Sequence, residues 1–378
     1  MVPSVFSWKK PKDSSLTTPR HERSKSRAAK KLVFADLSHV GAIETVYDEP
    51  SGSSTTTGLE EDNITEPQCK NVLTQTTSIH RKLSIEELSL NSKMLHYYTG
   101  LEDYDCFQFA LSTLGPNRFR LIYRGTVPTI SIENQFLVVL LRLRRYMSYL
   151  EISYLMSISE KVVSSIIITW INFMYIKWST LDLWPSKDLV QFYSPEDFHA
   201  MFPSTRVILD GVEIPVKKPS NPRLQQLTWS QYKNRNTLKS VPGVTPGGLV
   251  SWIPPASGGS CSDRIFVERG PLPQMCDPKD SVMVDKGFDV QDIFATKDVT
   301  VNIPTFLKNG NQFSVTALDR NRKIASKRVH VERIIGLAKT YRILERPLND
   351  IETVLGNRIV YCCFMLCNMR SCIVPSDA

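Results

Sequence analysis

The sequence predicts a mixed α/β protein in which a disordered tail precedes a small all-α unit and then an α/β domain. Three observations predict this order. Residues 1–92 are rich in Ser, Thr, Pro and charge, without a sustained apolar period. Residues 93–180 carry apolar side chains at helical spacing. Residues 203–373 combine short β-branched segments with a long amphipathic pattern, which favours a mixed α/β domain.

Charge is distributed unevenly along the 378 residues. Residues 1–35 hold nine basic and two acidic side chains, whereas residues 36–66 hold eight acidic and no Lys or Arg side chains. The remaining residues, 67–378, have a net charge of +9 within a total of +8. A basic folded part suits a polyanionic partner, although a merely soluble basic surface would have the same charge. Basic runs at 9–12 and 20–31 suggest nuclear import or DNA contact.

The composition also excludes some classes of protein. Eight cysteines are too few for a disulfide scaffold, and no secretory signal opens the chain. No stretch reaches 18 apolar residues without a polar or charged interruption, so no transmembrane helix is expected. A reducing intracellular compartment and no membrane partner follow as expectations.

Helices are predicted first along the chain. Residues 94–114, MLHYYTGLEDYDCFQFALSTL, have helix-like apolar spacing and end before Gly115-Pro116. Residues 132–178 contain several helical patterns separated by short polar joints at Ser157 and Ser159. These patterns predict a compact trihelical unit.

Strands and one long helix are predicted next. Short strands are expected at 206–210, 211–216 and 281–285, with two more within 238–254 around a Pro/Gly turn. One amphipathic helix with an exposed basic face is expected over 319–344. The apolar segment 351–369 fits either a strand or a helix.

Three acidic residues stand out by their positions. Asp210 and Asp285 each end an apolar strand, and Glu332 lies in the long helix between apolar neighbours. Acids at the ends of neighbouring strands point into the crevice where α/β sheets bind ligands. Three clustered carboxylates need cations, and two Mg²⁺ or Mn²⁺ ions there would suit phosphodiester cleavage. Spacing alone favours the plainer interpretation, in which the acids start loops or face solvent.

Longer motifs reverse that preference. In order, they are RVILDGVEIPVKKPS, WSQYKNRNTLKSVPGVTPGGLVSWIPPASGGSCSD, DSVMVDKGFDVQD and KIASKRVHVERIIGLAK. Together they resemble the DDE endonuclease domain of Harbinger-like (PIF/IS5-related) transposases, particularly the THAP-associated members, over roughly residues 95–372. The resemblance implies an RNase H-like fold with Asp210, Asp285 and Glu332 as the catalytic, metal-binding triad. It also implies a positioning role for Asp263.

The same resemblance assigns the trihelical unit to a helix-turn-helix. Tyr149–Leu155 is its expected first helix and Glu160–Trp170 its recognition helix, whose N-terminal residues would face base edges. That end offers only Lys161 as a basic side chain, so DNA reading and a packing role both stay open. Residues 2–6, VPSVF, resemble the box that closes a THAP zinc finger, which suggests a remnant after a lost finger.

Several basic residues are candidates for DNA contact, with a solvated surface as the alternative. They are Lys161, Lys233, Arg235, Lys239, Arg328 and Arg333. Cys362, Cys363, Cys367 and Cys372 are expected to be buried structural residues, because their spacing lacks metal-binding pairs. His330 is expected to be structural as well, because it lies two residues before Glu332 and would point elsewhere on a helix.

The resulting hypothesis is a nuclear DDE endonuclease that cuts, and in a transposase also joins, DNA with two divalent cations. DNA is the expected partner. A Myb-like accessory protein and a homo-oligomer are the further partners that the family suggests. The alternative is a domesticated, transposase-derived DNA-binding or interaction protein without cleavage activity.

Overall fold

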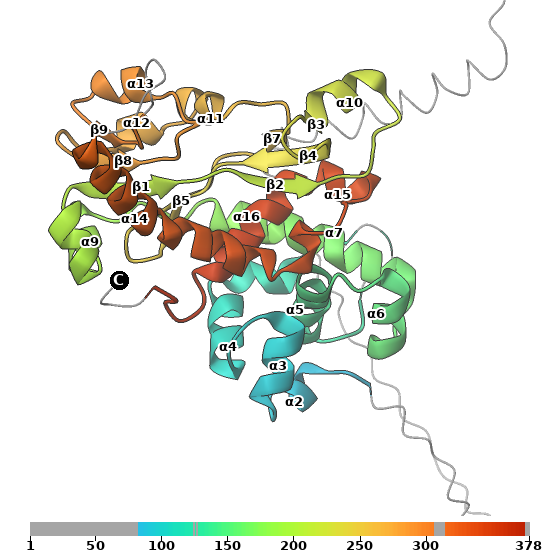
Figure 1. Ribbon diagram of the computed structural model, residues 1–378. Coiled ribbons are helices and arrows are strands. Elements are labelled where there is room, and N and C mark those ends of the chain that lie inside the picture. The colour runs from blue at the N-terminus through green and yellow to red at the C-terminus, as the bar shows by residue number, and fades with distance from the viewer. Residues whose placement is uncertain (1–81, 124, 126–127, 306–313, 375–378) are drawn as a thin grey trace, which may run out of the picture. The chain divides into compact units, whose positions relative to one another are not determined.

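Helices come first along the chain and strands second, in the computed structural model of residues 82–123, 125, 128–305 and 314–374 (Figure 1). The helical region contains α2 (Ile85–Leu88), α3 (Ser92–Thr99), α4 (Tyr104–Ser112), η1 (Pro116–Arg120), α5 (Ile132–Leu140), the π-helical turn η2 (Leu141–Arg145), α6 (Tyr149–Met156) and α7 (Glu160–Trp178). Two short helices, α8 (Lys187–Phe192) and α9 (Glu196–Met201), lead to the first strand. The predicted order of an all-α region and a mixed domain is therefore present.

Polar side chains set the starting points of most of these helices. Side-chain oxygens of Ser84, Asn91, Asp103, Ser131, Ser148 and Ser159 accept hydrogen bonds from backbone N–H groups of the first turns. The cap at Ser84 starts α2, whose Ile85 and Leu88 are buried in the helical core. The helical region therefore begins before the predicted boundary at residue 93. Residues 1–81 of the predicted tail, with the box at residues 2–6, lie outside the described residues.

The main sheet has five strands in the order β6-β5-β1-β8-β9. These strands are β1 (Thr205–Leu209), β5 (Gly243–Val244), β6 (Val250–Trp252), β8 (Ser281–Met283) and β9 (Thr300–Asn302). β1 pairs antiparallel with β5 and parallel with β8, and β8 pairs parallel with β9. The carboxyl ends of β1 and β8 therefore lie side by side.

A second, smaller set of paired strands lies next to the main sheet along the chain. It consists of β2 (Val212–Pro215), β3 (Trp229–Ser230), β4 (Arg235–Ser240) and β7 (Ser257–Gly258), with α10 (Pro222–Thr228) before β3. β1 is followed after residues 210–211 by β2, and β4 is followed after residues 241–242 by β5. Asp210 therefore lies at the interruption between two paired segments.

The main sheet is covered on both faces. Val207 and Leu209 of β1 pack in one apolar cluster with the segment of α11 (Asp263–Arg269), α12 (Leu272–Met275) and α13 (Gln291–Ala295). Ile208 points to the other cluster, which contains the buried side of α14 (Val315–Lys339). This alternation follows from the two-residue period of a strand. Figure 1 shows α11–α13 and α14 on opposite sides of β1.

The end of the chain connects the sheet domain to the helical region. After α14 come η3 (Arg342–Leu344), α15 (Asp350–Val354) and α16 (Gly356–Cys367). The segment predicted as strand or helix is therefore helical. α16 packs against α7 and against α14, and ten of its residues are buried. Because most of this short segment is apolar and buried, its sequence pattern alone fits either a buried strand or a buried helix.

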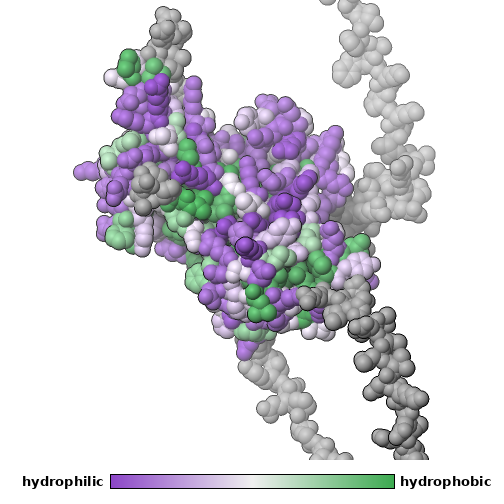
Figure 2. All heavy atoms as spheres, turned by 60° about the horizontal axis from the view of Figure 1, so that its bottom comes forward, coloured by the Kyte–Doolittle hydropathy of each residue, from purple (hydrophilic) through white to green (hydrophobic). Residues whose placement is uncertain are grey.

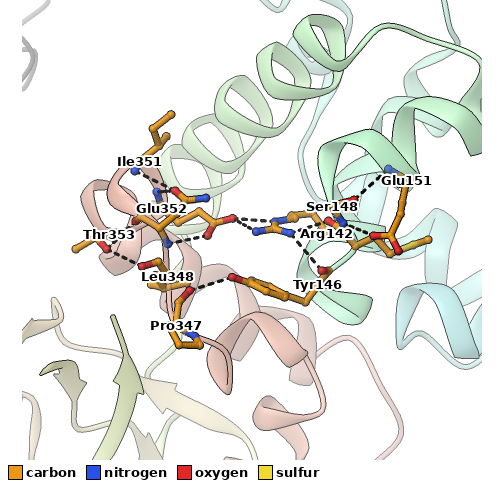
Figure 3. A network of polar contacts seen from close by, with 11 residues as sticks. Arg142, Tyr146, Ser148, Glu151, Pro347, Leu348, Ile351, Glu352 and Thr353 are labelled. Atoms are coloured by element: carbon orange, nitrogen blue, oxygen red, sulfur yellow. Dashed lines mark hydrogen bonds and ion pairs between the residues drawn. The ribbon is translucent and has the colours of Figure 1, made fainter. Parts of the chain in front are cut away.

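A buried ion pair adds a polar link between the two regions. Arg142 of η2 donates from Nε to Oε1 of Glu352 in α15 over 2.8 Å, and from Nη1 to the carbonyl oxygen of Met147 over 2.6 Å. The other carboxylate oxygen of Glu352 accepts the N–H of Asn349 at 3.1 Å. Figure 3 shows Arg142 and Glu352 pointing toward each other, with Tyr146 reaching Pro347 beside them.

Some predicted boundaries need correction. The long helix spans Val315–Lys339 rather than 319–344, whereas α7 ends at Trp178, as the helical patterns over 132–178 predict, and contains the expected recognition helix Glu160–Trp170. Strands β3, β7 and β9, of two or three residues each, were not predicted. No single helix of the described segments is both long and apolar enough to cross a bilayer; only α6 and α7 taken together pass that test, as a pair bent by 106°.

Candidate active site

Two of the three predicted acids lie at matching points on neighbouring strands. Ile208 of β1 is paired with Met283 of β8, and Asp210 and Asp285 each follow two residues later. Since the two strands are parallel, both acids lie at the same edge of the sheet. Asp210 keeps 23% of its side chain exposed and Asp285 keeps 47%, so Asp285 is the more accessible of the two.

The third acid comes from the long helix. α14 contacts β1 and β5 and buries Ile324, Val331 and Ile335. Glu332 follows Val331 and keeps 52% of its side chain exposed. The helix therefore uses one side for packing and holds Glu332 near the edge of the sheet.

Arg328 lies between the three acids. Its Nη1 donates a hydrogen bond to Oδ1 of Asp285 over 2.8 Å. Its Nη2 lies 3.6 Å from Oδ1 of Asp210 and 3.6 Å from Oε1 of Glu332, one helical turn away. Only 12% of the Arg328 side chain is exposed. All three carboxylates thus converge on a single guanidinium.

The charge of Asp210 depends on this surrounding. Burial raises the pKa of Asp210 to about 6. Arg328 and the N–H of Gly211, which donates to Oδ1 of Asp210 over 3.0 Å, act in the opposite direction on this pKa, whereas Asp285 and Glu332 raise it further. A bound cation would favour the ionised carboxylate.

A fourth acid is close to this group. Asp263, the first residue of α11, forms an ion pair with Lys239 of β4, with 2.9 Å between Oδ1 and Nζ. Gly211 follows Asp210, and a Cβ at that position would lie only 3.1 Å from Oδ1 of Asp263. The glycine thus allows Asp263 and Lys239 to approach the chain next to Asp210.

The other predicted DNA-contact residues lie elsewhere. Lys161 is exposed on α7, Lys233 and Arg235 are exposed around the start of β4, and Arg333 is exposed on α14. The structure therefore groups Arg328 and Lys239 with acids and leaves the other four basic residues on the surface. Figure 2 shows one face of the protein, mainly hydrophilic with hydrophobic patches.

The expected structural residues are mostly buried. His330 is 2% exposed, its Nδ1 lies 2.8 Å from the carbonyl oxygen of Pro246, and burial lowers its pKa. Cys362, Cys363 and Cys367 are buried as predicted. Cys372 is exposed, contrary to the prediction, because it follows the end of α16 and leaves the packed core.

The two helices assigned to the helix-turn-helix meet with the geometry of that motif. α6 and α7 meet at 106°, which is typical of this motif. Ser157 ends α6 with a φ of 53°, the left-handed conformation that glycine adopts most easily. Residues Val163, Ile166 and Trp170 of α7 are buried, while Glu160 and Lys161 at its start are exposed.

The acids have the chemistry of a divalent-cation site. Carboxylate oxygens are the ligands that Mg²⁺ and Mn²⁺ prefer, and each of the three acids already faces a positive charge. Among the residues that the structure describes, no group of three His, Cys, Asp or Glu side chains is arranged closely enough to hold a metal ion. The donor types therefore fit a metal, while Arg328 lies where the carboxylates converge.

The role of Arg328 between the acids was missed from sequence. Its spacing of four residues from Glu332 is a signal for a helical ion pair. The contacts to Asp210 and Asp285, however, join segments that are far apart in the chain and appear only in the folded structure.

Two known protein families match parts of the chain. Residues 209–368 match the family described as DDE superfamily endonuclease, and residues 128–180 match the helix-turn-helix of DDE superfamily endonuclease. No curated protein and no solved structure matches the chain. The first match contains Asp210, Asp285 and Glu332, and the second contains α6 and α7. Over these residues the chain is therefore similar to the endonuclease domain and the helix-turn-helix of DDE-superfamily, transposase-like proteins.

Proposed function

We propose that this protein is a divalent-metal-dependent DNA endonuclease of the Harbinger-like transposase type, with an RNase H-like catalytic domain. The observation that carries the proposal is the convergence of Asp210, Asp285 and Glu332 on one positive charge. The mixed five-stranded sheet with helices on both faces supports the proposed fold. THAP-associated relatives are the proposed subgroup, based on the sequence motifs.

The three acids are the proposed metal ligands. Asp210 and Asp285 would hold Mg²⁺ or Mn²⁺ from the sheet, and Glu332 would complete the site from α14. When bound, two such ions supply activation of a water or 3′-hydroxyl and neutralise charge on the leaving oxygen of a phosphodiester.

The surrounding residues would position the DNA. Asp263, held by Lys239, is the proposed positioning residue beside Gly211. The exposed side chains of Lys161, Lys233, Arg235 and Arg333 would bind phosphates and make the affinity dependent on salt. The proposed location is the nucleus, and the proposed protein partners are a Myb-like accessory protein and further copies of this chain.

A second candidate function is DNA binding without cleavage, as expected of a domesticated transposase. One observation favours it: the guanidinium of Arg328 already contacts all three acids, at the point where catalytic cations would have to lie. The two functions share the fold and the exposed basic residues, and they differ in whether the acids support chemistry.

Nicking of supercoiled plasmid separates the two functions. The full chain is compared with Asp285→Asn in Mg²⁺ or Mn²⁺ at several salt concentrations. The control is Asp319→Asn, which removes an exposed acid paired with Lys323 at the start of the same helix, α14. The endonuclease proposal predicts nicking by the unmodified chain and by Asp319→Asn, with loss in Asp285→Asn. Salt-dependent DNA binding with no nicking by any of the three would support the non-cleaving alternative.

A further inference from the structure

The position of Arg328 differs from that of a surface arginine. Its side chain is 12% exposed, and its Nε is buried without a hydrogen-bond partner in the part of the chain that the structure describes. Its charged end instead faces the three acids that are the proposed metal ligands. A guanidinium keeps its positive charge at all ordinary pH values, so it is a permanent counter-ion for them.

The three contacts of Arg328 are unequal. Only the bond to Asp285 has the length of a charge-assisted hydrogen bond, at 2.8 Å. The contacts to Asp210 and Glu332 are 3.6 Å long. Two of the three carboxylates, those of Asp285 and Glu332, keep about half of their side chains exposed to solvent. An incoming cation can therefore reach them without opening the core.

Removal of Arg328 would leave the acids without this counter-ion. Like charges held close together repel, and the repulsion is relieved by a cation or by protonation. Arg328 and a divalent cation would thus serve the same three carboxylates, and the two cannot occupy the same position. Competition follows directly from this overlap.

We propose that Arg328 is a built-in counter-ion that keeps the three acids assembled in the metal-free protein and is displaced from them when divalent cations bind. The inference rests on the proposed function, because it needs the acids to be metal ligands. Once displaced, the guanidinium is available to a DNA phosphate. Metal binding and DNA binding therefore strengthen each other, because coupling between two sites is reciprocal.

Binding of Mn²⁺ to the full chain, followed by electron paramagnetic resonance, tests the competition. The variants are Arg328→Gln, Asp285→Asn and the control Arg322→Gln, which removes an exposed arginine six residues earlier in α14. We expect Arg328→Gln to bind Mn²⁺ roughly tenfold more tightly, because about 1.4 kcal/mol of competing ion pairing is gone. Arg322→Gln should bind as the unmodified chain does, and Asp285→Asn more weakly.

Thermal melting provides a second readout that does not depend on activity. In EDTA, Arg328→Gln should melt at a lower temperature than Arg322→Gln, and added Mn²⁺ should reduce that difference. If Arg328→Gln does not fold without metal, Arg328→Lys replaces it. The compact ammonium of a lysine cannot bridge the three acids as the guanidinium fork does. The Mn²⁺ affinity of Arg328→Lys should therefore lie between that of the unmodified chain and that expected for Arg328→Gln.

The outcomes separate this inference from the proposed function. If Asp285→Asn loses Mn²⁺ binding while Arg328→Gln and Arg328→Lys bind no more tightly than the unmodified chain, the metal centre stands and the counter-ion inference is overturned. If Mn²⁺ binds to none of the variants, both are overturned. Binding that becomes measurable only in Arg328→Gln would support the inference most strongly.

Discussion

Two arginines of this chain bind carboxylates in contrasting surroundings. Arg142 and Glu352 have side chains that are 7% and 2% exposed, and the remaining polar atoms of the pair have backbone partners at Tyr146, Met147 and Asn349. Arg328 is also mostly buried, but its three acidic partners keep between 23% and 52% of their side chains exposed. The first centre is closed to solvent, and the second is open on its acidic side.

The difference separates a structural ion pair from an exchangeable one. Breaking a buried pair leaves an uncompensated charge in a poorly polarisable environment, so the pair at Arg142 is held in place by the high cost of separation. The partners of Arg328 are hydrated when they separate, and their attraction is weakened by solvent. A group of carboxylates that exchanges an arginine for a metal ion needs such partly exposed acids.

Loss of one partner at the closed centre should have the largest effect. We expect Arg142→Ala to lower the free energy of unfolding by about 3–5 kcal/mol, because Glu352 is left buried and unpaired. Urea unfolding measures this change. The double variant Arg142→Met with Glu352→Leu should lose less stability, because no buried charge remains. A loss below about 1 kcal/mol in Arg142→Ala would contradict the contrast between the two centres.

The pair between Lys239 and Asp263 offers an intermediate case. Asp263 is 22% exposed, between the 2% of Glu352 and the 23–52% of the acids at Arg328, and Lys239 is 14% exposed. Lys239→Met should lower the free energy of unfolding by about 1–2 kcal/mol, since Asp263 loses its partner beside Gly211. Lys323→Met, which removes an exposed helical pair with Asp319, is the matched control and should change it by less than about 0.5 kcal/mol. Equal losses of stability in Lys239→Met and Lys323→Met would contradict the expectation that the loss grows with the burial of the ion pair.

The smallest expected effect is the salt dependence of the stability lost at each of the two centres. In EDTA and at low salt, we expect Arg328→Gln to lower the free energy of unfolding by about 1 kcal/mol. That difference should shrink as salt approaches about 1 M, where the screening length falls to roughly 3 Å. The loss in Arg142→Ala should change little, because buried charges are screened less. Urea unfolding at increasing NaCl measures both losses. The same salt dependence in Arg328→Gln and Arg142→Ala would contradict the contrast between the two centres.

The sequence supports much of the fold and the acids of the candidate site. Strand-ending acids are recognisable because Asp210 and Asp285 each follow an apolar β-branched run. The alternation around Ile208 and the long helix with Glu332 are local patterns as well. A functional residue can be recognised from sequence when the segment that carries it also forms a recognisable strand or helix.

Features that depend on tertiary packing could not be predicted from local sequence patterns. The position of Arg328 between three acids requires β1, β8 and α14 to meet, and its nearest sequence signal concerns Glu332 alone. α16 could not be distinguished from a strand, because a short, mostly apolar segment with ten buried residues fits either element. β9 has only three residues, and Thr300 at its start is exposed.

A crystal structure with bound Mn²⁺ shows directly whether the metal replaces Arg328 between the acids, because anomalous scattering locates the ion independently of activity. We expect Mn²⁺ between the carboxylates of Asp210, Asp285 and Glu332, with the guanidinium of Arg328 turned away from them. At saturating Mn²⁺, three carboxylates that remain on Arg328 without any ion between them would contradict it.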